Sequence, residues 1–153
     1  MKDTPVSFQT VLVPLDGSPL AEKAIPFALD FAKRYAAKLL LFRVRAVPPA
    51  IWDAQEIPAV DALQQHEKKA CEEYLSKLTA GLGDQGIEIH SEHLAGNPAE
   101  TVIERAEDLP GAVIVMTSHG RDGIQRWLMG SVAEKVARHA TCPVLIVRGG
   151  EEK

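Results

Sequence analysis

The sequence predicts an α/β fold, in which residues 1–153 form a single domain around an open parallel sheet of five strands with helices on both faces. The length of 153 residues is typical of one domain with one core. Hydrophobic residues make up 46% of the chain and charged residues 25%, and both fractions are those of a globular protein. Short apolar runs alternate with helical patterns from end to end, and such alternation produces a parallel sheet through right-handed crossovers.

Five segments have the composition of strands. Four of them are near-continuous runs of Val, Ile and Leu, which indicate strands buried on both faces: Thr10–Leu15, Lys38–Val44, Ala112–Thr117 and Pro143–Val147. The fifth, Ile87–His93, begins by alternating apolar and polar residues. That alternation predicts a half-exposed strand at an edge of the sheet.

A helical segment separates each strand from the next. In the first, Leu20–Ala36, Ser18 is the expected N-cap and Pro19 the first helical residue. Pro26 lies well inside this segment and predicts a kink, because proline removes a backbone hydrogen bond. The other segments are Ala59–Leu82, a short helix that starts at Asn97, and Ser131–His139.

The charge balance excludes several classes of partner. Lys and Arg number 17 and Asp and Glu 21, so the net charge is −4, without the basic excess that nucleic acid or an anionic membrane surface requires. No run approaches the ~18 apolar residues of a membrane-spanning helix, and the first residues lack the apolar segment of a signal peptide. Cys71 and Cys142 do not form a CxxC pair and indicate reduced thiols. We therefore expect a cytoplasmic protein that binds neither nucleic acid nor membrane.

A ligand of such a sheet is expected outside the carboxyl ends of the strands, where the strand order reverses. Residues 15–18 follow the first strand and residues 117–123 follow the fourth. The chain has no GxGxxG after its first strand and no GxxxxGK[ST], which excludes ordinary dinucleotide and P-loop sites. His93-Leu94 stands where a phospho-receiver domain would carry a carboxylate.

Glycines after the fourth strand predict a phosphate site. Gly120, Gly123 and Gly130 allow the backbone to approach a ligand closely. The pair Gly130-Ser131 places N–H groups and a hydroxyl at a helix N-terminus, and Arg121 could add a cation. A structural role is equally compatible with the spacing, because residues 131–134 (SVAE) also have the pattern of a capping box.

The chain resembles the universal stress protein family. The resemblance rests on VLVPLDGS at residues 11–18 and on MTSHGRDGIQRWLMGSVAEKVARHATCPVLIVR at residues 116–148, and it covers nearly everything except Ala46–Pro58 and the termini. ATP-binding members of that family carry the pattern G-x2-G-x9-G-[ST]. Gly120, Gly130 and Ser131 match its last three positions, whereas Thr117 stands at the first glycine and adds a hydroxyl near the expected adenosine.

The resemblance implies a Rossmann-like fold of the adenine nucleotide alpha hydrolase type, with strand order 3-2-1-4-5. It implies that the chain binds ATP, or AMP or ADP, and acts as a regulatory or stress-response dimer. Mg²⁺ could accompany the phosphates. Two alternatives stay open: an interaction module that binds no nucleotide, and a slow ATPase, although no carboxylate or histidine is clearly placed to activate water and no carboxylate pair is evident for Mg²⁺. We assign no catalytic residue and no metal ligand.

The resemblance also assigns roles to individual residues. Asp16 would contact ribose or adenine, although a simple Asx turn before the first helix is the alternative. Val44 would hydrogen-bond adenine through its backbone. The nucleoside would be surrounded by Pro14, Leu15, Asp16, Val44, Met116 and Thr117. The phosphates would be surrounded by Gly120, Arg121, Gly130, Ser131 and Val132.

In the order 3-2-1-4-5 the third and fifth strands are the two edges of the sheet. The third is protected by charged and polar side chains, whereas the fifth has no charge before Arg148. A bare edge promotes aggregation, so we expect two copies to pair these strands antiparallel about a two-fold axis. The alternative is that Ala46–Pro58 or a helix covers the edge. The expected dimer contacts are Val144, Leu145, Ile146 and Val147.

Overall fold

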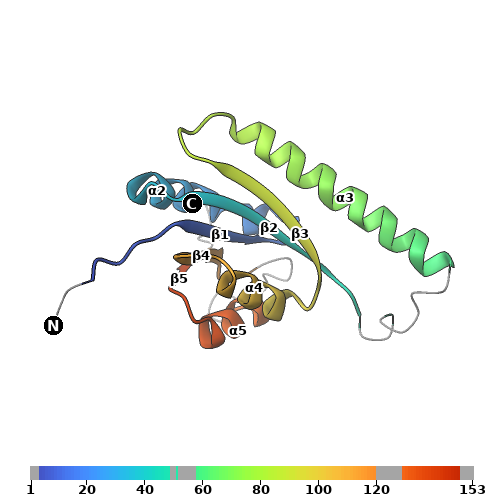
Figure 1. Cartoon of the computed structure of the whole chain (residues 1–153). Helices are drawn as coiled ribbons and strands as arrows, with labels where there is room; N and C mark the ends of the chain where they lie inside the picture. The colour runs from blue at the N-terminus through green and yellow to red at the C-terminus, as the bar shows by residue number, and fades with distance from the viewer. Residues whose placement is uncertain (1–3, 49–50, 52–57, 120–128, 149–153) are drawn as a thin grey trace, which may run out of the picture.

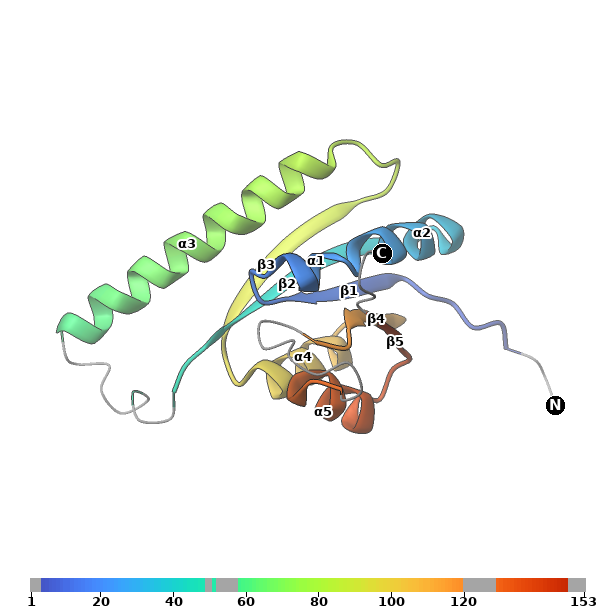
Figure 2. The same cartoon turned by 180° about the vertical axis from the view of Figure 1, so that it is seen from behind.

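The computed structural model describes residues 4–48, 51, 58–119 and 129–148. These residues form one five-stranded sheet in the order β3-β2-β1-β4-β5, as predicted. Helices cover both of its faces (Figures 1 and 2). The strands are β1 (Thr10–Leu15), β2 (Lys38–Ala46), β3 (Ile89–Gly96), β4 (Ala112–Thr117) and β5 (Val144–Val147).

Strand β1 lies at the centre of the sheet and pairs in parallel with both β2 and β4. The predicted bounds of the first and fourth strands are those of the structure. The expected strand Ile87–His93 is displaced along the chain to Ile89–Gly96, because its ladder with β2 continues to the pair Ala46 and Gly96. Strand β2 therefore extends past the end of β1, whose last pair with it is Leu15 and Arg43.

The first helical segment is broken where a kink was predicted. It consists of α1 (Pro19–Glu22) and α2 (Ile25–Tyr35), which a turn at Lys23 and Ala24 separates. Pro26 lies in the first turn of α2, where a helix needs no N–H from it, so the chain restarts the helix at this point and does not bend a continuous one.

The remaining helices have nearly the predicted bounds. Asn97 caps α4 by accepting a hydrogen bond from the Glu100 N–H at 3.2 Å. These helices are α3 (Pro58–Leu82), α4 (Pro98–Glu107) and α5 (Ser131–His139).

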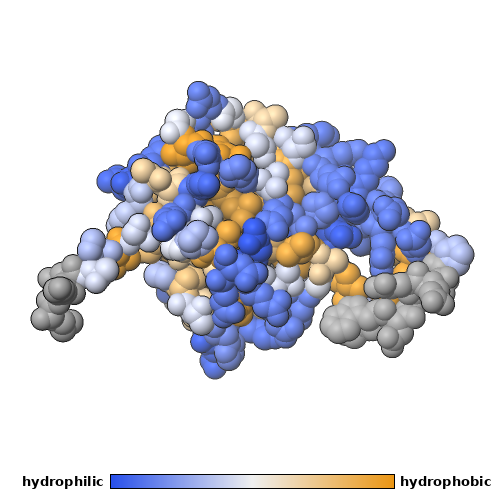
Figure 3. All heavy atoms as spheres, in the orientation of Figure 1, coloured by the Kyte–Doolittle hydropathy of each residue, from blue (hydrophilic) through white to orange (hydrophobic). Residues whose placement is uncertain are grey.

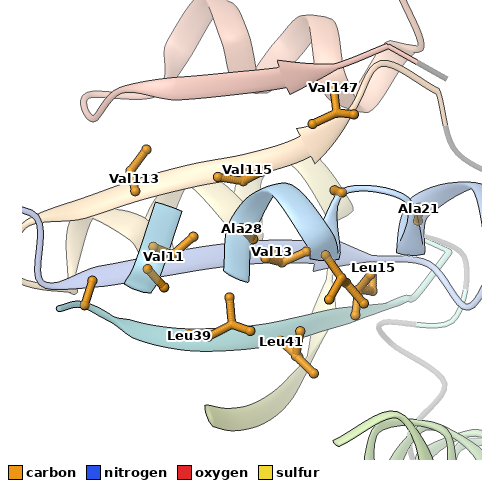
Figure 4. Packing of buried hydrophobic residues seen from close by; sticks show 14 of the residues in the cluster. Val11, Val13, Leu15, Ala21, Ala28, Leu39, Leu41, Val113, Val115 and Val147 are labelled. Atoms are coloured by element: carbon orange, nitrogen blue, oxygen red, sulfur yellow. The ribbon is translucent and has the colours of Figure 1, made fainter. Parts of the chain in front are cut away.

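Each face of the sheet carries its own apolar core. Figure 4 shows side chains of β1, β2 and β4 gathered on one face, which α1, α2 and α3 cover. The opposite side chains of these strands, together with α4 and α5, form the second core. Fully buried residues on alternate sides of β1 are Val11 and Val13 for the first core and Leu12 for the second.

Helix α3 is long and buries few of its residues against the sheet. Of its 25 residues only Cys71 and Leu75 are buried, and its outer surface is largely hydrophilic (Figure 3). Among the described residues no helix is both long and apolar enough to cross a membrane.

Candidate functional site

A cavity of about 640 Å³ lies at the carboxyl ends of β1, β2 and β4. Its volume is within the range of about 300–1,000 Å³ that is usual for small-molecule sites. Nine of the eleven site residues predicted from the sequence line it, and Gly120 and Arg121 lie outside the described residues. The nine are Pro14, Leu15, Asp16, Val44, Met116, Thr117, Gly130, Ser131 and Val132.

Asp16 holds the turn between β1 and α1. Its Oδ1 accepts a hydrogen bond from the Ser18 N–H at 2.9 Å and another from the Ser18 hydroxyl. The Ser18 hydroxyl oxygen accepts in turn from the Ala21 N–H at 3.2 Å, so Ser18 is the N-cap of α1, as predicted. Gly17 between them has a φ of +85°, a conformation that favours glycine. The Asx turn is therefore present, and it presents Asp16 at the wall of the cavity.

The N-terminus of α5 forms another part of the cavity lining. Gly130 is its N-cap and Ser131 its first residue, so the capping-box alternative with Ser131 as the cap is wrong. Within the part of the chain that the structure describes, no side-chain hydrogen bond caps the first turn of α5, whereas Ser18 and Asn97 cap α1 and α4. The first N–H groups of α5 are thus directed toward the cavity end of the helix, where its dipole favours negative charge.

The end of β4 is connected to α5 by a close backbone contact. The Gly130 N–H donates to the Ser118 carbonyl at 2.7 Å. A Cβ on Gly130 would lie 3.1 Å from the same carbonyl oxygen, which is tighter than most such contacts. Glycine at this position lets the helix N-terminus approach the strand end. His119 lies beside it, with its Nδ1 at 3.1 Å from the Ser118 Oγ.

Comparison with known proteins decides the family. The sequence model of the universal stress protein family matches residues 7–148. The chain belongs to the universal stress protein family. Universal stress protein MJ0531 of Methanocaldococcus jannaschii is 33% identical over 141 residues, which span 92% of this chain and 82% of the relative.

Solved structures share the fold of this universal stress protein. The hypothetical protein MJ0577 is similar with a TM-score of 0.83 and 26% identity, over 96% of this chain and 100% of its own. A universal stress protein crystallised in complex with cAMP has a TM-score of 0.64 and 24% identity, over 94% of this chain and 99% of its own. At 24% identity, the similarity to the cAMP complex shows a common fold.

Two arginines in the cavity of this universal stress protein were not among the predicted site residues. Arg43 and Arg45 are two positions apart near the end of β2, and both line the cavity. In the sequence they were noticeable only as interruptions of an apolar run. The spacing of two at the carboxyl end of a strand was the signal that could have identified them, because it places both side chains on one face beside the expected ligand.

Arg43 is held against α3. Its guanidinium carbon lies 4.9 Å from the ring centroid of Tyr74, whose hydroxyl donates to the Glu22 Oε1 at 2.8 Å. Burial and this hydrogen bond raise the pKa of Tyr74, so it is a neutral donor at physiological pH. Burial also raises the pKa of the nearby Cys71 thiol, although the charges of Arg43 and Arg45 oppose the shift.

Proposed function

We propose that this universal stress protein binds an adenine nucleotide, ATP foremost, in the cavity at the carboxyl ends of β1, β2 and β4. One observation carries the proposal. Residues from four separate segments, which the family resemblance assigned to one nucleotide, line a single cavity of suitable size. The known complex of a fellow family member with cAMP is consistent with an adenine nucleotide as the ligand.

The backbone of β2 offers a way to select adenine. The Lys38 N–H donates to the Gln9 carbonyl at 2.9 Å, whereas the Leu39 N–H donates to the Glu88 carbonyl on the other side. Backbone groups of a strand alternate in direction, so even-numbered residues of β2 face β1. The Val44 carbonyl therefore faces the β1 side beyond the last pair of that ladder, Leu15 and Arg43. At this position it can accept a hydrogen bond from the exocyclic amine of adenine.

The phosphates fit the uncapped N-terminus of α5. A bound phosphate would accept hydrogen bonds from the first N–H groups of the helix and from the Ser131 hydroxyl. Charge-assisted hydrogen bonds of this kind contribute about 1.5–3 kcal/mol each. Asp16, at the end of β1, would contact the ribose, and Met116 and Thr117 would lie beside the nucleoside.

The proposal includes a homodimer through β5. Leu145 on this edge strand is 41% exposed, and Val144 and Ile146 are half-buried. A second copy that pairs its β5 antiparallel would cover these side chains and the open backbone edge. The nucleotide would then act as a signal, because it would bind two states of that dimer with different affinities and so shift their populations.

Calorimetric titration tests whether the protein binds a nucleotide and whether it selects adenine. Adenosine carries an amine at the position where inosine carries a carbonyl oxygen. The inosine oxygen would face the Val44 carbonyl oxygen, and two hydrogen-bond acceptors repel each other. We expect ATP and AMP to bind, and ITP and GTP to bind at least about tenfold more weakly than ATP. The absence of heat and of a thermal shift with millimolar ATP would refute the proposal, and equal binding of ITP would refute the role of Val44.

A further inference from the structure

The cavity contains a second group that can bind anions, and the nucleotide motif does not account for it. Arg43 and Arg45 lie on the face of β2 that α3 covers, and both line the cavity. The N-terminus of α5, which we assign to the 5′-phosphates, follows β4 on the other side of β1. The two groups that can bind anions are therefore separated by the width of the central strand.

The Arg45 side chain has an unsatisfied donor. Its Nε is buried and has no hydrogen-bond partner among the described residues. A buried polar group without a partner is costly, and the cost is larger for a charged one. Among the described residues that line the cavity, the acidic ones are Asp16 and the exposed Glu67. A ligand with an acceptor group would satisfy this donor.

Arg43 lies next to the turn that we assign to the ribose. Its Nη2 is 3.1 Å from the position that a Cβ of Gly17 would occupy, so the guanidinium packs directly on the Asp16-Gly17 turn. The Tyr74 ring holds it there from the α3 side. The Arg43 guanidinium thus lies beside the turn where the ribose hydroxyls would lie, and Arg45, two positions further along β2, lines the same cavity.

We infer that Arg43 and Arg45 form a second anion subsite, which selects adenine nucleotides that carry a phosphate on the ribose 2′ or 3′ oxygen in addition to the 5′-phosphate. The inference rests on the proposed function, because the ribose is placed by that assignment. The chemistry is general: arginine beside a ribose accommodates a ribose phosphate in other nucleotide-binding α/β folds, and its planar group bonds phosphate oxygens in pairs.

The first test compares ligands on the unmodified protein. AMP, adenosine 2′,5′-bisphosphate and adenosine 3′,5′-bisphosphate are titrated by calorimetry at one salt concentration. We expect at least one bisphosphate to bind about tenfold more tightly than AMP, which corresponds to about 1.4 kcal/mol. If neither bisphosphate binds more tightly than AMP while AMP itself binds, the subsite is refuted and the proposed function stands. If no adenine nucleotide binds, both are refuted.

The second test uses matched charge changes. Arg45→Gln removes the charge and the Nε donor, whereas Arg34→Gln removes an equal charge on the surface of α2, where Arg34 pairs with Asp30 at 2.7 Å. We expect Arg45→Gln to lower the affinity for the favoured bisphosphate by a factor at least about threefold larger than the factor by which it lowers the affinity for AMP. Arg34→Gln should change neither affinity. An equal loss of AMP and bisphosphate binding in Arg45→Gln, or an equal effect of Arg34→Gln, would overturn the subsite.

Discussion

The Thr117 hydroxyl donates a hydrogen bond to the backbone carbonyl of His119, with 2.7 Å between Oγ1 and O. Thr117 stands where ATP-binding members of the family carry the first glycine of their motif. The residue is 5% exposed, and its hydroxyl donates to the chain's own backbone. The threonine therefore braces the turn after β4, from which the Ser118 carbonyl accepts the Gly130 N–H. Glycine at this position could not make that bond.

Thr117→Val tests this bracing. Valine keeps the shape of the side chain but leaves the His119 carbonyl without its partner, so we expect the free energy of unfolding to fall by about 1 kcal/mol. Thr117→Ser keeps the hydroxyl and serves as the control for the hydrogen bond, although it loses a buried methyl group. Urea denaturation of the three proteins measures the effect. A Thr117→Val protein as stable as the unmodified one would show that the bond contributes nothing.

The sequence predicted the sheet well because the decisive signals were local. The apolar runs of β1 and β4 have the bounds of the structure, and the N-caps Ser18 and Asn97 follow from residue type. The break between α1 and α2 did not follow, because Pro26 is compatible with either a kink or a new first turn. In the structure Pro26 lies in a new first turn, and Ile25 and Ala28 of that helix pack against the sheet.

The residues of the cavity were predictable only in part, because some of them have no local sequence requirement. The motif residues around Gly130 are recognisable in the sequence because a helix N-terminus needs a particular order of residues. The spacing of Arg43 and Arg45 indicates that they share one face at the end of β2. Whether that face borders the cavity depends on where β1 ends and how α3 crosses the sheet, and a strand pattern does not encode these tertiary relationships.

One pair of variants can separate the structural role of Asp16 from the ligand contact that we propose for it. Asp16→Ala removes the acceptor of the Ser18 N–H and hydroxyl, so we expect it to lose about 1 kcal/mol of stability and to weaken ATP and adenosine alike. Asp16→Asn keeps an oxygen that can accept from the Ser18 N–H, so its stability should stay within about 0.5 kcal/mol while both ligands still bind more weakly. Denaturation and calorimetry measure the two effects. Unchanged adenosine affinity in Asp16→Asn would leave Asp16 a structural role alone.

Ser131→Asp tests the phosphate site at the N-terminus of α5. Ser131 is exposed and is the first residue of the helix. A carboxylate there is favourable to the helix dipole by about 0.3–1 kcal/mol, so the fold should be kept or stabilised. The same charge would repel phosphates, and we expect ATP affinity to fall at least about tenfold while adenosine affinity is unchanged.

Ser131→Ala is the matched control, because it removes the hydroxyl without adding charge, and a loss of ATP affinity of about threefold is expected. This pair is cleaner than a substitution at Gly130, where a side chain would press on the Ser118 carbonyl. Calorimetry with ATP and adenosine measures both variants. ATP binding to Ser131→Asp at the unmodified affinity would place the phosphates elsewhere.

The last prediction concerns the edge at β5. Two leucines of nearly equal exposure lie at the two edges of the sheet: Leu145 on β5 is 41% exposed and Leu94 on β3 is 40% exposed. If two copies pair through β5, the unmodified protein should behave in light scattering as a particle of about 33 kDa, since each chain is 16.6 kDa.

Leu145→Lys places a charge in the proposed interface and should yield a folded monomer, or an unfolded chain if the monomer is not stable alone. Leu94→Lys adds the same charge at the other edge and should leave the dimer intact. A monomeric unmodified protein at high micromolar concentration, or equal dissociation by both lysines, would contradict pairing through β5.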